Sequence, residues 1–309
     1  MFKNKLLVVA LMMVALLAFG AMVGCGPDPA EEPPEPTEPE EPTEPEVEGT
    51  ISDITGIDPG AGIMAATEDA MEIYDLQVGL IEGSDAAMTA ELDSAIANEE
   101  WIIVTGWAPH WKFAEWDLKF LQDPELAYGG EEYIANIARQ GLADEHPEVH
   151  ELLQNFSWGD EDIGAVMAKN RDEAEFLANA QAWIEDNRDM VDGWIPEGLE
   201  GNGEEIEILM VEWECATAST YTMTAILEEA GYDVTVTPVD AGVMWSSIAE
   251  GDADFFVCAW LPGTHEAYMD DFEDSVDEVA TQYEGAQIGL VVPTYMPIDC
   301  ITEINDYAD

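Results

Sequence analysis

Hydrophobic residues in this chain gather into short runs that alternate with amphipathic segments. Three of the runs are rich in β-branched or aromatic residues and close on a tryptophan, at Trp107, Trp213 and Trp260. A short apolar run followed by a turn or helix signal is typical of a buried parallel strand. Because ligands bind at the carboxyl ends of the strands in open α/β sheets, we expect the three indoles to face one crevice.

Strand and helix patterns alternate in two blocks on either side of a helical segment. In the first block, predicted strands lie at 77–81 and 101–107 and a predicted helix at 64–74. In the second block, predicted strands lie at 206–213, 234–239, 255–260 and 288–292, with helices at 219–230 and 244–250. Residues 131–194, between the blocks, carry apolar side chains at helical spacing. This order predicts an α/β fold of two lobes with a ligand cleft between them.

The beginning of the chain reads as a targeting segment. Lys3 and Lys5 precede an apolar stretch over residues 6–23 that ends at Gly24-Cys25, which is the order of a secretory signal. We predict a signal peptide over 1–24 and, because the cleavage point resembles a bacterial lipobox, an acylated Cys25. An ordinary signal peptide and an uncleaved membrane anchor are the alternatives. All three place the protein outside the cytoplasm.

The predicted domains follow from these patterns. Residues 25–49 form an acylated cysteine and an acidic Pro/Glu linker, which lacks basic residues and apolar surface and is therefore expected to be disordered. We predict a first α/β lobe at 50–145, a helical connection that packs on the lobes at 146–204, and a second α/β lobe with a return to the hinge at 205–309.

The charge of the chain is extreme, since 68 Asp and Glu residues stand against 8 Lys and Arg, a net charge of −60. Nucleic acid is excluded as a partner because phosphate backbones are bound by Lys and Arg. Self-repulsion of this size is relieved by strong salt, where the Debye length falls to about 3 Å. The surface is therefore that of a protein adapted to a very salty medium, as in a halophile. No sequence pattern suggests a metal site or a cofactor.

Two cysteines lie near the tryptophan-bearing strand ends. Cys215 follows Trp213 by two residues, and Cys258 precedes Trp260 by two. We expect two buried free thiols, with a disulfide as the alternative in an exported protein. Cys300 has no obvious partner.

The candidate site combines an aromatic cage with a place for an anion. A quaternary ammonium group has no N–H to donate, so the faces of Trp107, Trp213 and Trp260 would have to hold it. The glycine-rich turn before Gly62 and Ile63 exposes backbone N–H groups at a helix amino terminus, where a carboxylate is favoured. His265 is a candidate side-chain donor to the same carboxylate. Secondary candidates are His110, Trp111 and Trp245. For the two tryptophans, packing on a helix face is the first interpretation.

Several motifs together resemble the substrate-binding proteins of glycine betaine ABC transporters. They are Asp58-Pro-Gly-Ala-Gly62, Ser84-Asp-Ala-Ala-Met88, Val104-Thr-Gly-Trp-Ala-Pro-His-Trp111, Asp240-Ala-Gly242, Ala259-Trp-Leu-Pro262 with Thr264-His265, and Gly289-Leu-Val-Val-Pro293. The resemblance covers 51–309 and implies a two-lobed, type II periplasmic-binding-protein-like fold. The block order resembles that of circularly permuted members. The resemblance also implies an ammonium prism at Trp107, Trp213 and Trp260, with the carboxylate on the amides of Gly62 and Ile63 and on His265.

The function implied by this resemblance is capture rather than catalysis. A lipid-anchored, extracytoplasmic protein would bind glycine betaine, or a close quaternary-ammonium solute, and deliver it to an ABC permease with its ATPase subunits for osmoprotection. Choline, carnitine and proline betaine are alternative ligands, and a sensory ligand-binding module is an alternative role. A hydrolase using His110 or His265 is disfavoured because no G-x-S-x-G or H-E-x-x-H motif accompanies either histidine.

Overall fold

The computed structural model describes residues 49–309. The predicted signal peptide, Cys25 and all of the linker before residue 49 lie outside the described residues. Within the described part, helices and strands alternate as an α/β protein, and the strands form one continuous sheet in the order β2-β1-β3-β9-β5-β8-β6-β7, with β4 beside β9. The predicted α/β class is therefore confirmed.

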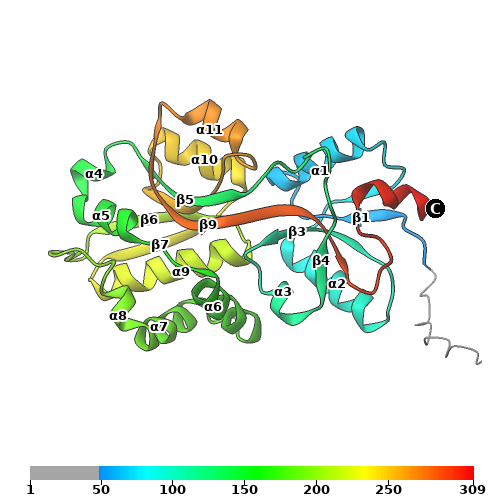
Figure 1. The fold of residues 1–309 in the computed structure, drawn as a ribbon. Helices are drawn as coiled ribbons and strands as arrows, with labels where there is room; N and C mark the ends of the chain where they lie inside the picture. The colour runs from blue at the N-terminus through cyan, green and yellow to red at the C-terminus, as the bar shows by residue number, and fades with distance from the viewer. Residues whose placement is uncertain (1–48) are drawn as a thin grey trace, which may run out of the picture. The chain divides into compact units, whose positions relative to one another are not determined.

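The first lobe contains three parallel strands and the helices between them (Figure 1). Its elements are β1 (Asp53–Thr55), α1 (Gly62–Ile73), β2 (Gly79–Ile81), α2 (Asp85–Ala97), β3 (Ile103–Ala108), α3 (Lys112–Glu115), β4 (Leu118–Phe120) and the 3-10 helix η1 (Ile301–Asp306). Helix α2 begins where the Ser84 hydroxyl accepts a hydrogen bond from the Ala87 amide at 3.2 Å, a regular N-cap.

The second lobe carries the larger part of the helices. Its elements are β5 (Glu132–Arg139), α4 (Leu142–Glu145), α5 (Pro147–Asn155), α6 (Asp160–Asp172), α7 (Phe176–Asp186), α8 (Arg188–Val191), β6 (Glu205–Met210), α9 (Glu214–Glu229), β7 (Asp233–Pro238), α10 (Ala241–Glu250), β8 (Phe255–Leu261) and α11 (Glu266–Phe272). Trp158, Trp183 and Trp194 pack on one another, and Trp158 and Trp194 also pack on Phe156, so these buried tryptophans are structural.

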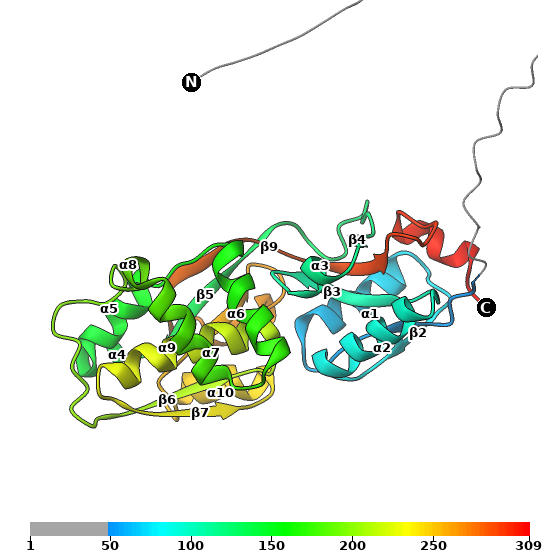
Figure 2. The same ribbon diagram turned by 90° about the horizontal axis from the view of Figure 1, so that it is seen from below.

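Two segments of the described chain cross between the lobes. One is the connection 121–131 from β4 to β5. The other is β9 (Val276–Pro293), whose first half pairs with β5 and whose second half pairs with β3 and β4 (Figures 1 and 2). Hinge closure of two lobes around a ligand turns on a few loop or element-terminal residues, and these two crossings are the connections that could provide them.

The two ends of the described chain meet in the first lobe. Ile51 forms a bridge with Ala308, and its amide donates a hydrogen bond to the Tyr307 carbonyl at 2.8 Å. Both ends of residues 49–309 therefore lie beside each other.

Some predicted elements are wrong. Residues 132–139 were predicted to be helical, but they form β5, because pairing with β8 on one side and β9 on the other overrides their helical spacing. These pairings put β5 in the second lobe, although the predicted first lobe, 50–145, includes it. The strand predicted at 288–292 is only the end of the 18-residue strand β9.

No helix among residues 49–309 combines the length and the apolar character needed to cross a membrane.

Candidate binding site

A small cavity lies where the two lobes meet, and it contains all three predicted cage tryptophans. The space between its lining atoms is about 260 Å³, part of which is open to solvent. Its lining residues are Ile57, Ala61, Gly62, Ile63, Trp107, Trp213, Trp260, Thr264 and Ile288. The indoles are almost fully buried, with exposed fractions of 4% for Trp107, 6% for Trp213 and 2% for Trp260.

Strand ends and strand pairing deliver the three indoles from both lobes. Trp107 lies near the end of β3 and pairs across the sheet with Ile288 of β9, which also lines the cavity. Trp260 lies near the end of β8, opposite Ile134 of β5. Trp213 follows β6 and is the N-cap residue of α9, in extended conformation. The expectation that the strand ends would bring these side chains together agrees with this geometry.

The amino terminus of α1 faces the same cavity through Gly62 and Ile63. The N-cap residue Ala61 has no side-chain acceptor, and the first amides of a helix have no partner within the helix. Among residues 49–309, the Gly62 and Ile63 amides donate to no side chain and to no backbone carbonyl outside the helix. They are therefore backbone donors at the positive end of the helix dipole.

Gly62 also allows the lobes to approach. A Cβ atom at this position would lie 2.0 Å from the carbonyl oxygen of Thr264, which belongs to the second lobe. The structure therefore requires glycine here because of a close contact between lobes, a role that the sequence pattern did not reveal.

His265 is a buried neutral donor in contact with two of the cage tryptophans. The Trp260 amide donates a hydrogen bond to its Nδ1 at 3.1 Å, so the ring proton sits on Nε2. Nε2 has no hydrogen-bond partner among the described residues. Burial lowers the pKa of His265 to about 3, which keeps the ring uncharged. Its ring lies 5.8 Å from that of Trp213, and the adjacent Thr264 lines the cavity.

The secondary candidates lie outside the cavity lining. Trp245 is fully buried and packs on His265 and Phe256. Trp111 has the Arg171 guanidinium over its ring at 4.7 Å. His110 uses both ring nitrogens within the protein, because Nδ1 accepts from the Lys112 amide and Nε2 donates to Asp85, each at 3.1 Å.

Sequence reasoning missed four lining residues: Ile57, Ala61, Thr264 and Ile288. Ala61 and Thr264 are direct neighbours of predicted site residues, so proximity in sequence could have suggested them. Ile57 and Ile288 carry no chemical signal, and Ile288 reaches the cavity through the pairing of β9 with β3.

The described part of the chain shows neither a metal site nor a disulfide. No group of three or more His, Cys, Asp or Glu side chains within residues 49–309 is arranged to hold a metal ion. Cys215 and Cys258 are buried free thiols with their sulfur atoms 3.9 Å apart, and Cys300 is also free.

Comparison with known proteins places these features in a family. Residues 38–186 and 204–309 match the family described as the substrate binding domain of ABC-type glycine betaine transport systems. The chain belongs to this family. Its members are transport binding proteins rather than enzymes, which confirms the expectation of a non-catalytic role.

Individual proteins are similar to this chain over different shares of its length. The chain is 40% identical to the glycine betaine/carnitine transport binding protein GbuC of Listeria monocytogenes, over 83% of this chain and 85% of the relative. It is 26% identical to the glycine betaine/proline betaine-binding periplasmic protein of Escherichia coli, over 48% of this chain and 53% of that protein. Lactococcal OpuAC in complex with glycine betaine is 37% identical, with a TM-score of 0.43; the match covers 47% of this chain and 57% of the OpuAC chain.

Proposed function

We propose that this protein captures glycine betaine, or a close quaternary-ammonium solute, in the cavity between its lobes and delivers it to an ABC permease. The observation that carries the proposal is the convergence of Trp107, Trp213 and Trp260, from both lobes, on one small cavity. Membership of the glycine betaine family supports the same ligand class.

The cage accounts for recognition of the cationic end. A trimethylammonium group cannot donate a hydrogen bond, and each desolvated indole face contributes about 0.5–2 kcal/mol of attraction. The cavity lining contains no Asp or Glu among the described residues, so π faces and apolar contacts are what the cation would meet. Three such contacts plus a well-bound carboxylate are compatible with micromolar affinity, about −8 kcal/mol.

Neutral donors account for recognition of the carboxylate. Gly62 and Ile63 line the cavity at the start of α1, where their amides have no other acceptor among the described residues, and His265, bonded to the Trp260 amide, offers an unshared Nε2–H. Preorganised N–H groups at a helix amino terminus bind an anion without a lysine or arginine. A zwitterion is therefore the ligand class that uses both halves of the site.

Calorimetry with three matched ligands tests this proposal. Glycine betaine carries both groups, choline lacks the carboxylate, and 3,3-dimethylbutanoate replaces the cation by an uncharged tert-butyl group of the same shape. We expect glycine betaine to bind at least about tenfold tighter than either analogue, since each loses one charged interaction. Equal binding of 3,3-dimethylbutanoate would contradict a cation cage.

Finer parts of the proposal concern the ligand's relatives and the cellular context. Carnitine and proline betaine share the required groups and belong in the same titration. The proposal further includes a lipid anchor at Cys25, a circularly permuted block order and a surface adapted to high salt. The bridge between Ile51 and Ala308 supports a permuted order, because adjacent chain ends make such a rearrangement inexpensive.

A sensory module that presents its closed form to a signalling partner is the alternative role. The presence or absence of permease and ATPase genes beside this one distinguishes the two roles.

A further inference from the structure

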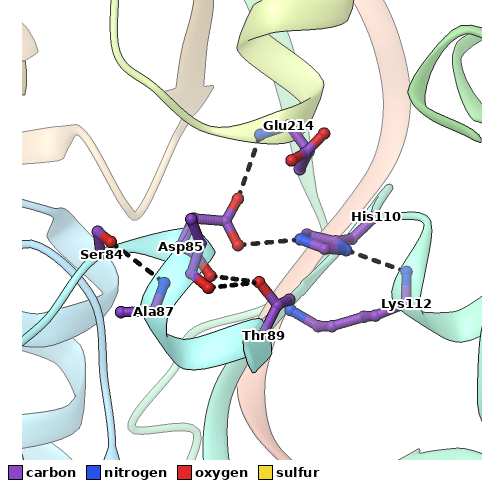
Figure 3. A network of polar contacts seen from close by, with 8 residues as sticks. Ser84, Asp85, Ala87, Thr89, His110, Lys112 and Glu214 are labelled. Carbon is purple, nitrogen blue, oxygen red and sulfur yellow. Dashed lines mark hydrogen bonds and ion pairs between the residues drawn. The ribbon is translucent and has the colours of Figure 1, made fainter. Parts of the chain in front are cut away.

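A buried carboxylate connects the two lobes next to the cage. Asp85 is the first residue of α2 and is only 3% exposed. One of its oxygens accepts a hydrogen bond from His110 Nε2 at 3.1 Å, and the other accepts the Glu214 backbone N–H at 3.2 Å (Figure 3). The first contact lies within the first lobe, whereas the second reaches into the second lobe.

The Glu214 contact caps a helix from the opposite lobe. Glu214 is the first residue of the 16-residue helix α9, and the N-cap residue, Trp213, provides no side-chain acceptor of its own. A carboxylate at this position satisfies a free helix amide and interacts favourably with the helix dipole. The cap forms only while the lobes touch, and it lies one residue from a cage tryptophan.

Buried positive charge keeps Asp85 ionised. The Lys112 side chain is fully buried, and its ammonium lies 4.1 Å from the centre of the Trp107 ring, without a hydrogen-bond partner among residues 49–309. Despite burial, the interactions with His110 and Lys112 hold the pKa of Asp85 below its usual value. The same cluster therefore touches Trp107 on one side and the residue after Trp213 on the other.

We propose that Asp85 is a positioning residue for ligand capture. It caps α9 from the opposite lobe, and this contact couples closure of the lobes to the placement of Trp213 opposite Trp107. The uncharged His110 ring orients the carboxylate through its Nε2–H, and the buried Lys112 ammonium supplies the compensating positive charge. The inference rests on the proposed function, since it assigns a cause to the closing of that same site.

Two substitutions at Glu214 isolate the proposed hydrogen bond. Glu214→Pro removes the donated N–H, and proline is well tolerated at the first position of a helix. The extended backbone of Trp213 (φ −99°, ψ 147°) is also what a residue before proline requires. Glu214→Ala removes the side chain but keeps the N–H, so it is the matched control. We expect the proline variant to bind glycine betaine at least about tenfold more weakly than the alanine variant, the size expected for a hydrogen bond to a charged group.

Asp85→Asn and Ser84→Ala provide an independent pair at the other end of the contact. Asp85→Asn is expected to reduce affinity by a similar factor and to abolish the ligand-induced protection of the first amides of α9 from hydrogen exchange. Ser84→Ala removes the ordinary cap of α2, so it lowers the melting temperature but leaves affinity and α9 protection unchanged. A merely structural Asp85 would lower the melting temperature without altering the protection of α9.

The outcomes separate this inference from the proposed function. If the unmodified protein binds no quaternary-ammonium solute, the proposed function fails and the inference falls with it. If the unmodified protein binds glycine betaine but the proline and alanine variants bind equally well, the cap between lobes plays no part in capture and the inference alone is overturned.

Discussion

Substitution of Gly62 by alanine tests whether the lobes must approach as closely as the structure has them. An added Cβ would lie 2.0 Å from the Thr264 carbonyl oxygen and 2.6 Å from its Cγ2, whereas real Cβ contacts stay above 3.0 Å. The two lobes would therefore have to separate locally by about 1 Å. The backbone amide of residue 62 is retained, so any loss of affinity comes from impaired closure.

The size of the expected loss of affinity follows from the contacts that this separation of the lobes weakens. The Tyr268 hydroxyl of the second lobe donates to the Gly60 carbonyl of the first at 3.1 Å, and a separation of about 1 Å breaks this bond. A hydrogen bond contributes about 0.5–1.5 kcal/mol, and a looser cage loses part of cation–π contacts worth about 0.5–2 kcal/mol each. A total near 2 kcal/mol corresponds to roughly a thirtyfold higher Kd.

Calorimetric titration with glycine betaine measures this effect, and Gly60→Ala is the control. A Cβ at Gly60 would meet nothing within 4 Å, so that variant should bind like the unmodified protein. The ligand-free melting temperature of Gly62→Ala should not fall, because alanine suits a helix better than glycine and the clash needs closed lobes. Equal affinity of the Gly62 and Gly60 variants would refute the reasoning.

Three further predictions concern the cage, the anion donors and pH. Trp260→Ala should raise the Kd for glycine betaine at least about tenfold in calorimetry, and Trp260→Phe should recover part of the loss, because a π face is restored; equal affinity of both variants and the parent would contradict the cage. His265→Phe should weaken binding of glycine betaine, about tenfold or more, but leave choline unaffected, because choline has no carboxylate to accept from Nε2; equal losses for both ligands would indicate a packing defect instead. Burial and the Asp85 carboxylate raise the pKa of Glu214 to about 7. Closure of the lobes therefore favours protonated Glu214, so affinity for glycine betaine should be highest near pH 4.5, fall as the pH rises towards 7 and then level off. Glu214→Gln should flatten this pH profile. An unchanged slope in the Gln variant would assign the pH dependence to another group.

The cage could be predicted from sequence because it depends on a general property of the fold. Trp107 and Trp260 end hydrophobic strands and Trp213 follows one, and open α/β sheets bring such ends to one crevice. The amides of Gly62 and Ile63 could be predicted similarly from the helix signal that follows the glycine-rich turn. These local patterns predict a site for both ends of a zwitterion.

Features that arise from contact between distant segments could not be predicted. Strand β5 resembles a helix in its apolar spacing and becomes a strand only between β8 and β9. Asp85 looks like an ordinary first-turn acid of α2, and its contact with the Glu214 amide lies 129 residues away in sequence. Lys112 has the same character, because nothing in its neighbourhood marks it as a buried cation beside Trp107.

A crystal structure of the protein with glycine betaine tests the central claim most directly. The account predicts the trimethylammonium group between Trp107, Trp213 and Trp260, within about 6 Å of each ring centre, with the carboxylate at the Gly62 and Ile63 amides. Electron density for the ligand outside this cavity, or with its carboxylate among the indoles, would contradict the account.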